Sequence, residues 1–191
     1  MIPSSCDPFR VIIITVPPEE IRSHIEPLRQ RLCSLGGDPR ALAYPPHITL
    51  RTGAFIPRDQ LQAYIHDLGA SIAGMTPFPV RAQRLYLGPT DHQGCQRFIC
   101  AATFAPSPDL HRLNQRLLSV SRYQKREQSS FWPHLSLVYG NLSLEGLRAV
   151  QSYLADNPEI LKPEWSWSID HVALYTLQST HWQPLHIFNL P

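Results

Sequence analysis

The chain has 191 residues, of which 43% are hydrophobic and 17% are charged, and its formal net charge is +2 at pH 7. This length and composition exclude a disordered chain, and they allow either one large domain or two small lobes that fold together around a hydrophobic core. The weak positive charge suits a small phosphate ligand or an RNA end better than duplex DNA, which requires a basic stripe on the protein.

The sequence shows no pattern typical of export or of a membrane span. The strongest apolar run, residues 11–16, is far too short to cross a bilayer. Asp7 and Pro8 precede it, where a signal peptide would have basic residues. The cysteines lack C-x-x-C spacing, so we expect reduced thiols at Cys6, Cys33, Cys95 and Cys100. These features predict a cytoplasmic protein.

The chain begins with a predicted strand and a predicted helix. Residues 10–16 are dense in β-branched side chains and end at two prolines, which is typical of a buried strand. Apolar residues then recur at helical spacing until a pair of glycines ends the segment. This helix would bury Ile21, Ile25, Leu28 and Leu32.

Helices and strands alternate through the rest of the chain. Amphipathic spacing predicts helices over residues 58–73, 108–120 and 144–155. Strand composition is found over residues 78–87 and 96–104, around His134, and over residues 168–177 and 182–190. Turn-forming residues at 88–94 predict a hairpin between the first two of these strands. No linker divides the chain.

One segment of the sequence occurs twice. Residues 44–53, Tyr-Pro-Pro-His-Ile-Thr-Leu-Arg-Thr-Gly, align without a gap with residues 131–140, Phe-Trp-Pro-His-Leu-Ser-Leu-Val-Tyr-Gly. A bare H-x-[S/T] pattern is expected about once by chance in a chain of this composition. A chance repeat of the extended pattern, with its shared proline, aliphatic residue and leucine, is improbable. The repeat therefore indicates two equivalent functional segments.

Strand geometry would give each segment a polar face and an apolar face. Alternate side chains of a strand point to opposite sides, so His47 and Thr49 would share one face, as would His134 and Ser136. The aliphatic residues between them would point into the core. Each segment would then present an imidazole beside a hydroxyl group.

The two motifs resemble those of the two-histidine (2H) phosphoesterase superfamily, which includes RNA 2′-5′ ligase-like proteins and the cyclic phosphodiesterases of tRNA splicing. The stretches at 47–50 and 134–137 match both H-x-[S/T]-aliphatic signatures, and the resemblance covers most of the chain. It implies an α+β fold of two pseudo-symmetric lobes, each an antiparallel sheet covered by helices, with a central cleft that carries both motifs. We therefore expect residues 1–191 to form a single bilobal domain.

The resemblance implies a cyclic phosphodiesterase, a phosphoric diester hydrolase that opens a nucleoside or RNA-terminal 2′,3′-cyclic phosphate to a phosphomonoester. His47 and His134 would be the catalytic acid and base, because imidazole titrates near neutrality. Thr49 and Ser136 would bind the phosphate by hydrogen bonds. By analogy with the family, His134 is the base and His47 the acid, and the symmetry of the repeat leaves the reverse assignment open. No metal and no other cofactor is implied.

Aromatic residues flank both motifs and are candidates for stacking on a nucleobase: Tyr44, Trp132 and Tyr139. The alternative is that they fill the core. Arg51 follows the first motif, either as a phosphate contact or as a solvated surface residue. The expected partner is a nucleotide or an RNA 3′ end that carries a cyclic phosphate. We expect the protein to be a monomer and not to bind a membrane.

Other functions are compatible with parts of this pattern. An ADP-ribose 1″,2″-cyclic phosphate phosphodiesterase or an RNA 2′-5′ ligase would use the same two histidines and two hydroxyl groups. A non-catalytic RNA-binding module of the same fold would be expected to have lost at least one of them. A metal-dependent hydrolase would require grouped Asp, His or Cys ligands, which the sequence does not present at the usual spacings.

Overall fold

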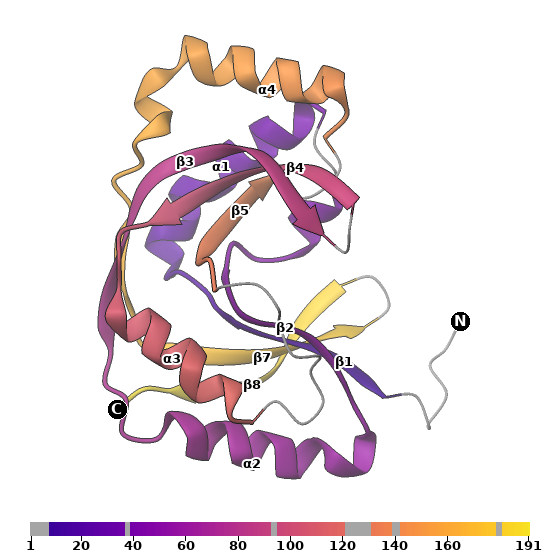
Figure 1. Ribbon diagram of the computed structural model, residues 1–191, viewed down its shortest axis with the longest axis vertical. Helices are drawn as coiled ribbons and strands as arrows, with labels where there is room; N and C mark the ends of the chain where they lie inside the picture. The colour runs from indigo at the N-terminus through magenta and orange to yellow at the C-terminus, as the bar shows by residue number, and fades with distance from the viewer. Residues whose placement is uncertain (1–7, 37–38, 93–94, 121–130, 139–141, 179–180) are drawn as a thin grey trace.

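The computed structural model describes residues 8–36, 39–92, 95–120, 131–138, 142–178 and 181–191. In these segments, four α-helices cover a curled antiparallel sheet of eight strands (Figure 1). The strands are β1 (Phe9–Thr15), β2 (Ile48–Ile56), β3 (Phe78–His92), β4 (Cys95–Phe104), β5 (His134–Val138), β6 (Ser166–Ile169), β7 (His171–Gln178) and β8 (His181–Asn189). The helices are α1 (Glu19–Ser34), α2 (Leu61–Ile72), α3 (Pro108–Leu118) and α4 (Leu144–Asp156). None of these helices is long and apolar enough to cross a membrane.

The sheet consists of two halves that meet at its centre. The strand order is β6-β3-β4-β5-β2-β1-β7-β8, and every pair of neighbours is antiparallel. The halves join between β5 and β2, where Ile48 lies directly opposite Leu135. The predicted α+β fold is confirmed, and the two antiparallel halves are parts of one continuous sheet.

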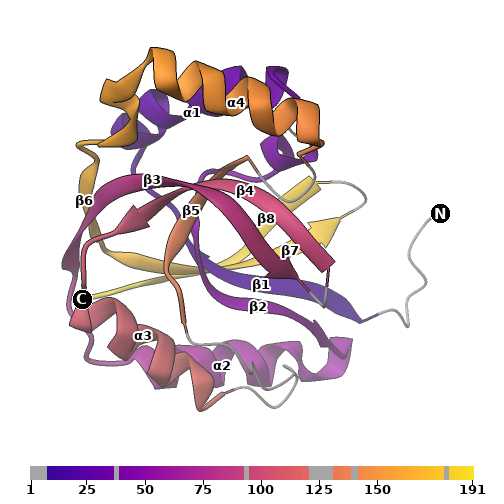
Figure 2. The ribbon, with the colours of Figure 1, turned by 45° about the horizontal axis from the view of Figure 1, so that its top comes forward.

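The helices lie in two pairs, and one helix of each pair crosses to the other half of the sheet. Helices α1 and α4 lie together on one side of the molecule, and α2 and α3 lie together on the other (Figures 1 and 2). Helix α1 follows β1 in the chain but packs against β5, and α3 follows β4 but packs against β2. Helix α1 thus follows a strand of one half and covers the other half, and α3 does the same in the opposite direction.

Two predicted elements differ from the structure. The strand expected over residues 168–177 is broken at Asp170: β6 pairs with β3 in one half, and β7 pairs with β1 in the other. Both pieces have strand composition, so their pattern does not reveal that the chain changes halves between them. The carbonyl of Asp170 accepts a hydrogen bond from the backbone of Leu190 at 2.7 Å, which fixes the crossing point.

The expected turn at 88–94 is shorter than predicted, because β3 continues through Gly88 and Pro89 to His92. The pairing with β6 ends at Arg81, so this part of β3 is paired on the β4 side, and an edge strand tolerates proline. The Tyr86 hydroxyl donates to the carbonyl of Pro89 at 2.8 Å. A Cβ at Gly88 would lie 2.6 Å from that hydroxyl, which explains the glycine.

Candidate active site

The two motif histidines lie where the halves of the sheet meet. His47 immediately precedes β2, and His134 is the first residue of β5. These strands are neighbours, and each histidine comes just before one member of the central pair, Ile48 and Leu135. The fold thus brings together two motifs that are far apart in the sequence.

Burial follows the predicted alternation in both motifs. The aliphatic residues are buried, whereas the histidines, Thr49 and Ser136 are half-buried. In an antiparallel pair, moving one residue along one strand moves one residue back along the other. This register places Thr49 beside His134 and Ser136 beside His47. Each imidazole therefore has the hydroxyl residue of the other motif as a neighbour.

The same hydrogen bond orients both imidazole rings. Nδ1 of His47 lies 2.8 Å from the carbonyl oxygen of Pro45, and Nδ1 of His134 lies 2.9 Å from that of Trp132. A carbonyl oxygen can only accept, so Nδ1 carries the proton and donates it in each case. In the neutral ring, Nε2 then has the lone pair. Both histidines can therefore take up or give up a proton at Nε2.

A proline in each motif explains this bond. Pro46 and Pro133 lie between the acceptor residue and the histidine. The proline ring fixes its own φ angle and restricts the residue before it to extended backbone. The direction of the acceptor carbonyl relative to the histidine ring is thus set by the local sequence in both motifs.

Burial lowers the pKa of both histidines. The pKa of His47 falls from 6.5 to about 4, mainly through desolvation, and the positive charges of Arg29 and His134 lower it further against the bond to Pro45. Desolvation also lowers the pKa of His134, and the hydrogen bond to Trp132 opposes it. Both rings are therefore neutral at pH 7. Because a charge on one disfavours a charge on the other, the pair holds a single added proton more readily than two.

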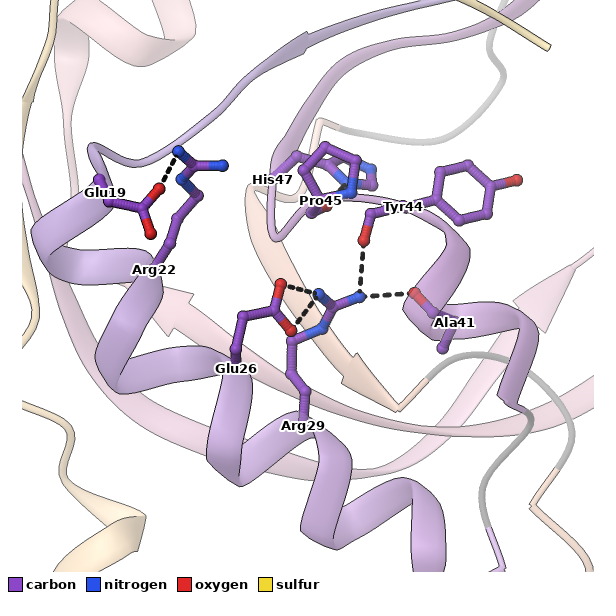
Figure 3. Close-up of polar contacts among 8 residues, drawn as sticks. All are labelled: Glu19, Arg22, Glu26, Arg29, Ala41, Tyr44, Pro45 and His47. Carbon is purple, nitrogen blue, oxygen red and sulfur yellow. Dashed lines mark hydrogen bonds and ion pairs between the residues drawn. The ribbon is translucent and has the colours of Figure 1, made fainter. Parts of the chain in front are cut away.

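Arg29 is a buried cation behind the first motif, and the sequence pattern did not single it out as a site residue. It donates to both carboxylate oxygens of Glu26, at 2.9 and 3.0 Å, and to the carbonyl oxygens of Ala41 and Tyr44 (Figure 3). Its side chain is 2% exposed. The available signal was its position one helical turn after Ile25, on the core side of the predicted helix.

Trp132 lies against the ring of His134. The ring centroids are 4.4 Å apart and the planes are 28° apart, so the two rings are stacked. Tyr86 of β3 contacts the indole edge-on, with the centroids 5.4 Å apart. Trp132 remains 40% exposed, so part of its surface is open to a ligand.

Tyr44 lies near His47, with their ring centroids 5.8 Å apart. It stacks on Trp182 of β8 at 5.1 Å, and the guanidinium of Arg10 lies 5.8 Å from the same indole ring. Tyr139, the third predicted stacking residue, is outside the described residues. Trp182, like Tyr86, comes from a distant strand, and no sequence spacing signals such a neighbour.

Arg51 fits neither of the two predicted alternatives. The register of β2 against β1 shifts at Leu50, which disturbs the alternation and turns Arg51 to the core side of the sheet. The Arg51 side chain is 1% exposed, so it is neither solvated nor accessible from the face of the motif histidines. The carbonyl of Leu50 accepts a hydrogen bond from Asn114 of α3 at 2.7 Å.

Comparisons with known proteins support the family resemblance of the chain. The family model of the 2′-5′ RNA ligase superfamily matches residues 17–181. No curated protein matches the chain significantly.

Solved structures share the whole fold. TT0787 of Thermus thermophilus superposes with a TM-score of 0.66 at 20% identity, over 95% of this chain and 97% of that chain. LigT of E. coli in complex with 3′-AMP gives a TM-score of 0.66 at 18% identity, over 96% and 99%. Usb1 of Kluyveromyces marxianus gives 0.54 at 12% identity, over 96% and 99%. At these identities the likeness concerns the fold.

Proposed function

Because this chain belongs to the 2′-5′ RNA ligase superfamily, we propose that it is a metal-independent cyclic phosphodiesterase. It would hydrolyse a nucleoside or RNA-terminal 2′,3′-cyclic phosphate to a phosphomonoester. The observation that carries the proposal is the pair of imidazoles at the centre of the sheet, each oriented by the same backbone bond through Nδ1. The E. coli LigT complex contains 3′-AMP, a nucleoside monophosphate, which is the class of product proposed here.

The two histidines supply general base and general acid catalysis. In the assignment that follows the family, Nε2 of His134 takes a proton from a water molecule, and that water attacks phosphorus in line with the scissile P–O bond. Nε2 of His47 gives a proton to the ribose oxygen that leaves. One P–O bond forms and one breaks, and the product is a phosphomonoester with a free hydroxyl group.

Thr49 and Ser136 bind the phosphate in this scheme. Their neighbouring positions, each beside the histidine of the other motif, suit hydrogen bonds to the two non-bridging oxygens. Donors that are already oriented stabilise the charge that the transition state places on these oxygens. The phosphate would lie between the motifs, within reach of both imidazoles.

The substrate brings the acid into its active form. With a pKa of about 4, His47 is neutral in the unliganded protein at pH 7. The negative charge of a bound phosphodiester raises the pKa of a neighbouring imidazole. We infer that His47 takes up its proton as the substrate binds, and then transfers it to the leaving oxygen.

Trp132 and Tyr44 are the proposed stacking residues. Each lies against a motif histidine, and Trp132 is partly open to solvent. Stacking of a base on an aromatic ring contributes about 1–3 kcal/mol and tolerates any base. The partner would then be a nucleotide or an RNA 3′ end.

The proposal is tested by turnover in the presence of EDTA. The substrates are 2′,3′-cyclic nucleotides, RNA oligomers with a cyclic phosphate end, and ADP-ribose 1″,2″-cyclic phosphate, and formation of a 2′-5′ linkage from RNA ends is followed separately. We expect the wild type to hydrolyse the 2′,3′-cyclic substrates. His47→Ala and His134→Ala should each lose a hundredfold or more in kcat, since general acid–base catalysis contributes roughly 10²–10⁴-fold.

A matched control is His66→Ala, at an exposed position on α2, which should turn over like the wild type. Activity that is unchanged in both motif variants would exclude the two-histidine mechanism and favour the RNA-binding module. Activity that EDTA abolishes would favour a metal-dependent hydrolase. Exclusive turnover of the ADP-ribose substrate would identify an ADP-ribose 1″,2″-cyclic phosphate phosphodiesterase instead. Net formation of 2′-5′ linkages would identify an RNA 2′-5′ ligase.

A further inference from the structure

Arg29 takes no part in the mechanism above, although its guanidinium is buried, where a charge is costly unless it is fully compensated. We propose that Arg29 is a positioning residue for His47, which fixes the backbone before the histidine and keeps a positive charge behind the imidazole. This inference rests on the proposed function, because it assigns Arg29 to the acid of that reaction.

The contacts of Arg29 connect α1 to the segment that leads to His47. Nη1 of Arg29 donates to the carboxylate of Glu26 on the same helix, and Nη2 donates to the carbonyls of Ala41 and Tyr44 (Figure 3). The carbonyl of Tyr44 belongs to the peptide between Tyr44 and Pro45. The carbonyl of the next residue, Pro45, accepts the hydrogen bond of the imidazole. Arg29 thus fixes the peptide next to the one that orients the catalytic ring.

Arg29 also makes the two histidines unequal. Among the described residues, the charged or titratable groups around His47 include Arg29 and its partner Glu26 from α1, His134 from β5, and the phenol of Tyr44 on its own segment. The charge of Arg29 lowers the pKa of His47, whereas the causes found for His134 are burial and its backbone bond. An acid of lower pKa gives up its proton more readily once it is protonated. The buried arginine therefore suits His47 to the acid role.

The test is a titration of the imidazole nitrogens by ¹H–¹⁵N NMR in full-length protein. In Arg29→Met we expect the pKa of His47 to rise above about 4 but to stay below 6.5, because burial, the largest cause of the low value, remains. The pKa of His134 should be unchanged. Arg29→Lys retains the positive charge, so the low pKa of His47 should persist, although a single ammonium group lacks the fork that joins Glu26 to the two carbonyls. Glu26→Gln leaves the arginine charge uncompensated and should not raise the pKa of His47.

Kinetics provide the second readout. Arg29→Met should lower kcat about tenfold or more, because a small misplacement of a catalytic group reduces the rate strongly, while KM should change little. The alkaline limb of the kcat profile, where the acid loses its proton, should move upward together with the pKa of His47. If Arg29→Met does not fold, Arg29→Gln, which retains a donor for the carbonyls but no charge, tests the same rise in pKa.

The control is Arg112→Met on α3. It removes the exposed ion pair of Arg112 and Asp109, which has the same three-residue spacing as Arg29 and Glu26 and an N–O distance of 3.0 Å. It should change neither the titration nor kcat. If the charge-removing variants fold and leave the titration and tautomer of His47 unchanged, Arg29 is not a positioning residue, whatever the reaction. If the titration moves but the wild type hydrolyses no cyclic phosphate, the proposed function fails and the role of Arg29 toward His47 stands.

Discussion

The two histidines share one hydrogen bond pattern but have different surroundings. His134 stacks on the indole of Trp132, and an aromatic face attracts a cation, so this contact favours the imidazolium that a base becomes during the reaction. His47 lies near the buried charge of Arg29, which disfavours its imidazolium and favours the release of a proton. Both surroundings agree with His134 as base and His47 as acid.

These roles can be separated by the leaving group of the substrate. A phosphodiester with a p-nitrophenyl group releases a weakly basic oxygen that leaves without being protonated, so it does not need a general acid. On this substrate we expect His47→Ala to retain roughly tenfold more of the wild-type kcat than His134→Ala does. Initial rates of p-nitrophenolate release give the comparison, and the opposite order would exchange the roles of the two histidines.

The local sequence could predict the faces of both motifs, because strand alternation and the proline before each histidine act within a few residues. It could not predict the neighbours of the histidines. Trp182 and Tyr86 come from distant strands, and Arg29 reaches the first motif from a helix. Arg51 lies in the core, against both expectations, because one extra residue at Leu50 interrupts the alternation. The faces of the two motifs were thus predictable, and most of the neighbours of their histidines were not.

At the scale of elements, β2 is shaped by its irregularity at Leu50. The extra residue allows the strand to present Thr49 beside the histidines and then to turn Arg51 into the core. Such an irregularity interrupts the regular ladder of hydrogen bonds. The buried amide of Asn114 on α3 bonds the carbonyl of Leu50, so a helix holds the distorted strand next to the site.

Removing this amide should destabilise the protein. Asn114→Ala leaves the buried carbonyl of Leu50 without this donor, and an unsatisfied buried polar group costs about 1–3 kcal/mol. We expect the free energy of unfolding, measured by urea denaturation, to fall by about that amount. Gln115→Ala, at an exposed position on the same helix, is the control and should change stability little. Equal stability of the two variants would mean that the bond contributes nothing.

The elements themselves were predictable to the extent that local composition decides them. The four α-helices lie within or close to the predicted ranges, because each has a clear apolar stripe. The break at Asp170 and the extension of β3 to His92 depend on which strands pair, and the partners lie far along the chain. Pairing between distant segments is tertiary information that composition does not carry.

At the scale of the whole molecule, the lowered histidine pKa values link stability to pH. The pKa of His47 is about 4 in the folded protein, against 6.5 for a solvated imidazole such as the unfolded chain exposes. The unfolded chain therefore binds this proton more readily, and stability is lost as the pH falls through the range between these two values. His134, whose pKa is also lowered, acts in the same direction.

We expect the free energy of unfolding to be about 1 kcal/mol lower at pH 5 than at pH 7 on account of His47, after allowance for the partial exposure of its ring. Urea denaturation at a series of pH values measures this difference. His47→Gln should make the dependence shallower, whereas His66→Gln, at an exposed position, should leave it as in the wild type. An unchanged dependence in His47→Gln would show that the histidine titrates alike in the folded and unfolded protein.

The crossed covering of the two halves has a consequence for synthesis on the ribosome. Helix α1 is made early, but the strand that it covers, β5, follows much later, after β4 and α3. Until β5 emerges, α1 lacks a strand that it covers in the folded protein, and the first motif has no partner. The half that contains β3, β4 and β5 can close only when β6 emerges, and the other half only when β7 and β8 follow, so both halves form late, through contacts distant in sequence.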